Sequence, residues 1–169
     1  MVAAIMALKA DAVRKSFYSF EVIDLWRGLN SPLDAGRSNR VVEKKSLTEI
    51  LKQLHHLPNR TPEMAFSGEA DSAFSDIASY RDGVISVGYY SGNSEWECHP
   101  SGDEIVMAIK GSTTLVLLVN GIQHSLSLNP GELVVVPQGH WHRFAASMHL
   151  KVMSVTPQPT EHTLEVPSI

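Results

Sequence analysis

From Met64 onward the sequence consists of short apolar runs separated by turn residues, and this pattern constrains the fold more than any other feature. The clearest turn is Asn120-Gly121, which separates apolar runs at 113–119 and 122–128. An Asn-Gly pair in this setting predicts a two-residue β-hairpin, because both turn positions need positive φ. Short strands divided by frequent turns are typical of an antiparallel β-sandwich or barrel. Further strands are expected at 84–90, 105–109, 133–136, 140–145 and 149–155.

The first third of the chain has a different pattern. Helical spacing of apolar residues predicts a short helix at 4–15, and alternation at 17–25 indicates an extended arm. Ser46 and Glu49 form a capping box that opens a predicted helix over 47–57. His55 and His56 would end that helix, where imidazoles favour the negative end of its dipole. We expect residues 1–62 to form an arm with short helices packed on a barrel of residues 63–169.

Composition excludes several classes of protein. The chain has 169 residues, a formal net charge of −4 and scattered charges, which argue for one soluble domain without a nucleic-acid surface. Its single cysteine, Cys98, cannot form an internal disulfide, which favours a reducing compartment. The apolar opening at 1–8 is too short to span a bilayer and lacks a basic start. We therefore expect a cytoplasmic protein with no membrane contact.

A candidate metal site is formed by residues on both sides of the turn at 100–103. Glu97 and His99 lie two residues apart, so in an extended strand they face the same way, and Glu104 begins the next strand. His142, from the later segment 137–142, would add a second imidazole. Two imidazoles with one or two carboxylates suit a divalent cation. Two alternatives remain open: Glu97 is either a metal ligand or a hydrogen-bond acceptor for one, and Glu104 at a strand end could also be exposed.

His140 is the candidate proton carrier. It lies two residues before His142 and would share its face of a strand. An imidazole titrates near neutral pH, so His140 could act as a general acid or base in the cavity. A histidine facing solvent from a turn fits the sequence equally well.

These residues resemble the two characteristic motifs of the cupin superfamily. Glu97, His99, Glu104 and Gly111 are similar to the first motif when a four-residue gap precedes Glu104, and the second motif is matched by Gly131, Pro137, Gly139 and His142. A three-residue gap would place Cys98 and Pro100 in the histidine positions, and proline has no ligating side chain. Glu97 departs from the first histidine of the family pattern, and Ala146 from the final asparagine. The resemblance implies an antiparallel cupin barrel, or jelly roll.

The resemblance also implies a set of functions. A divalent ion (Zn, Fe, Mn or Ni) held by Glu97, His99, Glu104 and His142 would support isomerase or dioxygenase chemistry on a small oxygen-rich metabolite. A non-catalytic barrel that binds or senses a small molecule is the alternative. The apolar outer face around Ile105, Met107 and Ile109 further predicts a homodimer, since exposed apolar patches commonly mark interfaces.

Overall fold

The computed structural model describes residues 42–168. The chain divides into a unit at Met1–Glu43, of which residues 42 and 43 are described, and a second unit at Lys44–Ile169. The predicted helix at 4–15 and arm at 17–25 lie outside the described residues. Among residues 42–168, no helix combines the length and the hydropathy needed to cross a bilayer.

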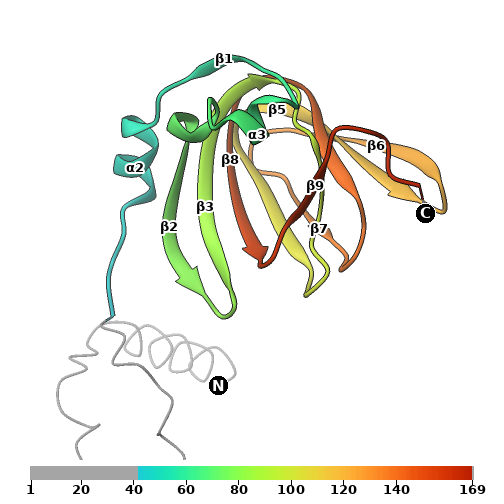
Figure 1. The fold of residues 1–169 in the computed structure, drawn as a ribbon. Helices are drawn as coiled ribbons and strands as arrows, with labels where there is room; N and C mark the ends of the chain where they lie inside the picture. The colour runs from blue at the N-terminus through green and yellow to red at the C-terminus, as the bar shows by residue number, and fades with distance from the viewer. Residues whose placement is uncertain (1–41, 169) are drawn as a thin grey trace, which may run out of the picture. The chain divides into compact units, whose positions relative to one another are not determined.

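The second unit is mostly β-structure (Figure 1). Its helical elements are short: α2 (Leu47–Gln53), α3 (Met64–Ser67) and the 3-10 turn η2 (Asp71–Ala73). The strands are β1 (Leu57–Arg60), β2 (Phe74–Tyr80), β3 (Gly83–Gly92), β4 (Trp96–Cys98), β5 (Glu104–Val119), β6 (Ile122–Leu128), β7 (Leu133–Val136), β8 (His142–Pro157) and β9 (Glu161–Thr163).

The strands form one curved sheet in which β8 is the central element. β8 pairs antiparallel with β3, β4 and β5, and β5 also pairs with β6 and β7. β2 and β9 extend the antiparallel arrangement on β3 and β4, and β1 pairs parallel with β3. This topology confirms the predicted antiparallel barrel. It also places β4, β5 and β8, which carry the candidate ligands, beside one another.

The Asn120-Gly121 hairpin is confirmed. Both residues have positive φ, 51° and 75°, and β5 pairs with β6 from Val119↔Ile122 back to Thr113↔Leu128. The strands expected at 105–109 and 113–119 are a single strand, β5, with register shifts between Ala108 and Thr114. Gly111 makes the shift possible, because its φ is +74° and a Cβ there would lie 2.3 Å from the carbonyl oxygens of Met148 and His149.

Helix α2 begins as predicted and ends early. The Ser46 side chain accepts a hydrogen bond from the Glu49 amide, which confirms the cap. The helix stops at Gln53, so the expectation that His55 and His56 end it was wrong: both follow it, outside any helix or strand. Leu54 already has an extended backbone, and Pro58 disfavours helical conformation at Leu57, from which the segment instead pairs with β3. His56 stacks on His149, with 4.6 Å between ring centres.

The largest core cluster lies between β3, β5 and β8. Its fully buried members are Tyr90, Val106, Ala108, Leu115 and Leu150, with Val136 from β7. A second cluster on the other side of β5 packs Trp96, Val116 and Leu118 against Trp141. Alternate residues of β5 therefore pack on opposite sides of the sheet, as strand geometry requires.

Candidate metal site

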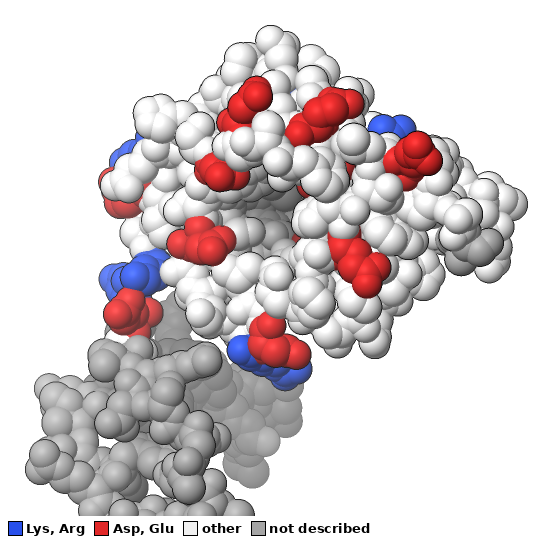
Figure 2. Space-filling model, viewed as in Figure 1, with Lys and Arg blue, Asp and Glu red and all other residues white. Residues whose placement is uncertain are grey.

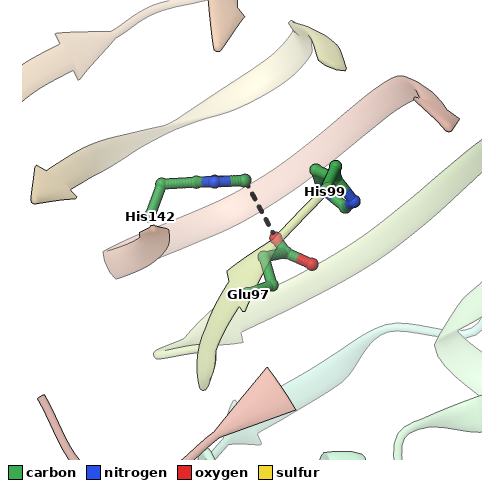
Figure 3. A group of neighbouring side chains, drawn as sticks. All are labelled: Glu97, His99 and His142. Atoms are coloured by element: carbon green, nitrogen blue, oxygen red, sulfur yellow. Dashed lines mark ion pairs between the residues drawn. The ribbon is translucent and has the colours of Figure 1, made fainter. Parts of the chain in front are cut away.

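Glu97 and His142 oppose each other across two neighbouring strands. They are paired residues in the β4–β8 ladder, so their side chains lie on the same face of the sheet. His142 Nε2 is 3.4 Å from Glu97 Oε1 (Figure 3). His99, just after β4, points to the same place, and one ligand atom from each of the three residues lies within 4.8 Å of the others.

Glu104 joins this group from the first position of β5. Its Oε2 lies 2.9 Å from His142 Nε2 and 3.3 Å from His99 Nε2. Its Oε1 accepts a hydrogen bond from Thr156 Oγ1 at 2.7 Å. Glu104 is buried, so the alternative that it is an exposed strand-end residue was wrong.

The two turns that carry the site are held together by hydrogen bonds. Asp103 Oδ1 accepts from the Gln138 backbone amide at 2.8 Å, and the Gln138 side chain donates to the Pro100 carbonyl at 2.6 Å. The Gly139 amide donates to the His99 carbonyl at 3.0 Å. These bonds fix the position of His99 relative to the start of β8, although the residues come from distant parts of the sequence.

Both imidazoles are oriented through Nδ1. His142 Nδ1 donates to the His140 carbonyl at 3.2 Å, and His99 Nδ1 lies 3.2 Å from Thr160 Oγ1. A partner at Nδ1 fixes the ring orientation and directs Nε2 toward the cluster. In neutral His142, Nε2 is therefore the unprotonated nitrogen, which is the form that binds a metal.

Three of the four residues in the cluster are buried, and Glu97 is partly exposed. His142 is fully buried and His99 and Glu104 are nearly so, while the Glu97 side chain keeps 17% of its surface exposed. Glu97 and Glu104 line a cavity of about 270 Å³ whose wall also includes Tyr90, Phe144 and Val152. Figure 2 shows this face of the molecule hollowed, with acidic side chains around the hollow.

The donor set fits a divalent cation. A neutral His142 Nε2 and a Glu104 carboxylate are both acceptors, so a distance of 2.9 Å requires a proton or a cation between them. Burial alone would raise the pKa of Glu104, but the hydrogen bond with His142 and the nearby His99 imidazole outweigh burial and hold that pKa well below its usual range. In addition, no group among residues 42–168 completes a hydrogen bond to the buried His99 Nε2. A metal ion would satisfy all three groups.

The cupin family profile matches residues 82–164, which extend from the β2–β3 turn through β9. Residues 82–164 therefore form a cupin domain. No curated protein matches this cupin.

Parts of this chain are similar to solved structures. Protein NMB1881 from Neisseria meningitidis aligns over 69% of this chain and all of its own, with 16% identity and a TM-score of 0.51. A cupin-2 domain protein from Shewanella frigidimarina aligns over 50% of this chain and 79% of its own, with 25% identity and a TM-score of 0.42. The likeness to NMB1881 supports the fold alone.

His140 does not line the cavity of this cupin. It lies in the turn before β8, and its Nδ1 donates to the Gln138 carbonyl at 3.3 Å. The expected alternation of 140 and 142 requires both residues to be in the strand, and β8 begins only at His142. A catalytic role for His140 stays a prediction.

Three cavity residues were not identified from the sequence. Arg60, Glu95 and His162 lie on the cavity wall beside Glu97. Arg60 Nη2 donates to Glu95 Oε2 at 2.9 Å, and His162 Nδ1 is 3.2 Å from Glu95 Oε1. The sequence did contain a signal for Glu95, because residues 95, 97 and 99 share one face of an extended strand. Arg60 and His162 had none, because only the pairing of β1 with β3 and of β9 with β4 brings them here.

Proposed function

We propose that this cupin binds one divalent metal ion through Glu97, His99, Glu104 and His142 and acts as a metal-dependent enzyme on a small oxygen-rich organic metabolite. The observation that carries the proposal is the convergence of two imidazole Nε2 atoms and two carboxylates on the wall of a cavity. A site used only for structure usually surrounds its metal with protein ligands. Here the Glu97 side opens into the cavity, which leaves room for a substrate oxygen.

Isomerase and dioxygenase reactions are the proposed classes of chemistry, with Zn, Fe, Mn or Ni as the candidate ions. A bound divalent ion would polarise a substrate oxygen or lower the pKa of a bound water. The protein's own part is to orient the imidazoles through Nδ1, to hold Glu104 through Thr156 and to exclude bulk water with Tyr90 and Phe144. His140 is proposed as a proton carrier only if the turn at 137–140 moves toward the cavity.

A non-catalytic cupin that binds or senses a small molecule is the second candidate. One observation favours it: His140, the predicted proton carrier, is not among the described residues that line the cavity. Two of the carboxylates that do line it have partners, since Glu104 contacts His142 and Glu95 contacts Arg60. On this reading the metal would fix a ligand without further chemistry.

Metal analysis of protein purified without a histidine tag tests the first step. We expect about one divalent ion per chain, with ligand distances of about 2.0–2.6 Å in a metal-loaded crystal. The second step is a turnover screen over sugars, keto acids and phenols, with and without a chelator. Turnover that the chelator stops supports an enzyme, and we expect His140→Ala to slow it more than it weakens binding. Metal-dependent binding with no turnover would favour the binding protein, and a protein that takes up no metal contradicts both.

The proposed partners are a small-molecule ligand and a second copy of this chain. Ile105 pairs with Val135 and Met107 with Leu133, so these four apolar side chains share one face of β5 and β7. Ile105, Leu133 and Val135 are exposed. An uncovered patch of this kind supports a homodimer. The single, buried cysteine supports the proposal of a cytoplasmic location.

A further inference from the structure

Arg60 lies on the cavity wall, beside the rings of Phe74 and Tyr90 and the carboxylate of Glu95. It ends β1, and only 8% of its surface is exposed. Its guanidinium carbon lies 4.6 Å from the ring centre of Tyr90 and 5.0 Å from that of Phe74. Burying a cation is costly unless it is paired and hydrogen-bonded, so its contacts indicate what it does.

The protein satisfies this guanidinium only in part. Nη2 donates to Glu95 Oε2 at 2.9 Å, and no group among the described residues accepts a hydrogen bond from Nε. A guanidinium has five N–H donors in a fixed fork, and one carboxylate oxygen does not satisfy them. Glu95 is itself shared, because its other oxygen contacts His162. The arrangement leaves Arg60 able to accept a second anionic partner.

The surroundings define what that partner would be. The cavity of about 270 Å³ is near the lower end of the usual range for ligand pockets, so it suits a small molecule. Phe74, Val84, Phe144 and Val152 contribute apolar walls. From Arg60 a short series of contacts leads through Glu95 to Glu97: ligand atoms of Glu95, Glu97 and His162 lie within 4.8 Å of one another. A ligand held at Arg60 would thus extend toward the metal site.

We infer that Arg60 is the carboxylate-binding residue of the cavity and that the ligand is a small organic acid with an apolar or aromatic body. The carboxylate binds the guanidinium, and a second oxygen of the same molecule approaches the Glu97 side of the metal site. The carboxylate contact at Arg60 does not depend on the proposed function. Only the second contact, at the metal site, rests on it. Glu95 positions Arg60 by fixing one edge of its fork.

Two other roles for the same residues fit less well. A second metal ion at Glu95, Glu97 and His162 would have to compete with the Arg60 guanidinium, which already binds Glu95 Oε2. A purely structural clamp between β1 and Glu95 would need no cavity position for the guanidinium, yet Arg60 lines the cavity. If Arg60 and Glu95 formed only a structural clamp, variants of these residues would change folding but would not change the preference for a charged ligand.

The test compares benzoate with benzamide, which have nearly the same size and differ in charge. Binding of both to metal-loaded full-length protein is measured by calorimetry, and metal content is measured on the same samples. We expect benzoate to bind roughly tenfold or more tightly, as for a hydrogen bond to a charged group. The double variant Arg60→Met with Glu95→Gln removes both charges together, so no buried charge is left unpaired. It should abolish the preference while metal content stays unchanged.

A preference that survives in the double variant, or none in the native protein, overturns the inference. If the double variant does not fold, the single variants decide. Arg60→Lys should keep only part of the preference, because an ammonium lacks the planar fork. Glu95→Gln should tighten benzoate binding, because the guanidinium loses its internal anion, and weaker binding would contradict the inference. If the protein takes up no metal but still prefers benzoate through Arg60, the result contradicts the proposed function and still supports the carboxylate site.

Discussion

His142 Nε2 lies 2.9 Å from Glu104 Oε2, and the opposite nitrogen of the same ring donates to the His140 carbonyl. With Nδ1 occupied by a proton, Nε2 can face a carboxylate only if it carries a proton itself or if both atoms bind a cation. The metal-free and metal-loaded proteins therefore differ by a proton on His142. Metal binding should release it, which makes metal affinity fall as the pH is lowered.

The first prediction concerns the pH dependence of stability in the metal-free protein. Burial alone would lower the pKa of His142, but hydrogen bonds to Glu104 and Glu97 outweigh burial and raise the pKa from 6.5 to about 10. Because the folded pKa is above the unfolded one, the stabilisation is complete below pH 6.5 and is lost as the pH rises through about 10. Urea denaturation from pH 6 to 10 should show this loss, and Glu104→Gln should reduce it. If the unfolding free energy of the native protein and of Glu104→Gln changed equally with pH, the result would contradict the ion pair between Glu104 and His142.

The second prediction is that His99→Ala loses the metal and keeps the fold. His99 has one hydrogen-bonding contact, between Nδ1 and Thr160 Oγ1, and its Nε2 has no hydrogen-bond partner among the described residues, so its removal breaks few protein contacts. His55→Ala is the matched control, since His55 is exposed and distant in sequence from the site. Metal content by elemental analysis should fall to background in the first variant and stay unchanged in the second. Full metal content in His99→Ala would remove His99 from the ligand set.

The third prediction addresses whether Glu97 binds the metal directly. Glu97 opposes His142 across the β4–β8 ladder, in a place where the cupin pattern has a histidine. If Glu97 is a ligand, Glu97→His should still bind metal but shift preference from Mn toward Zn or Ni, because imidazole suits those ions better than carboxylate does. Competition between Mn and Zn measures the shift. Glu97→Gln should weaken binding of both ions. Unaltered affinities would show that Glu97 does not bind the metal directly.

The sequence was informative where chemistry and spacing are local. The Asn120-Gly121 turn defined the β5–β6 hairpin, and the Pro100–Asp103 turn between His99 and Glu104 correctly indicated that both would face one site. The period of two placed Glu97 with His99. Each of these inferences depends on residues fewer than ten positions apart, for which backbone geometry leaves little choice.

The parts that the sequence did not predict depend on distant pairings. Arg60 enters the cavity because β1 pairs parallel with β3, and His162 because β9 pairs with Glu97 and its neighbours. Neither pairing has a local signal. The start of β8 was misplaced by two residues for a similar reason: hydrogen bonds from Gln138 and Gly139 to the first turn hold 137–140 as a turn of its own.

The fourth prediction separates two glycines that both have positive φ. A Cβ at Gly111 would meet the carbonyl oxygens of Met148 and His149 at 2.3 Å, whereas nothing lies within 4 Å of one at Gly121. Gly121→Ala should therefore cost only the left-handed backbone strain, about 1–2 kcal/mol. Gly111→Ala adds overpacking against backbone and should cost roughly 2–5 kcal/mol. Chemical denaturation of both variants measures the difference, and similar values would mean that the β5 bulge relaxes freely.

The last prediction tests the dimer through two apolar residues of similar exposure. Leu133, 59% exposed, lies in the face shared by β5 and β7, and Ile122, 62% exposed, lies at the start of β6. If the β5–β7 face is the interface, Leu133→Lys places a charge in it and should convert the dimer to a monomer, because burying an unpaired ammonium is costly. Ile122→Lys should leave the dimer intact. Light scattering at working concentrations measures the oligomeric state of both variants. A native protein that is already monomeric, or a Leu133→Lys variant that stays dimeric while Ile122→Lys dissociates, would place the interface elsewhere or remove it.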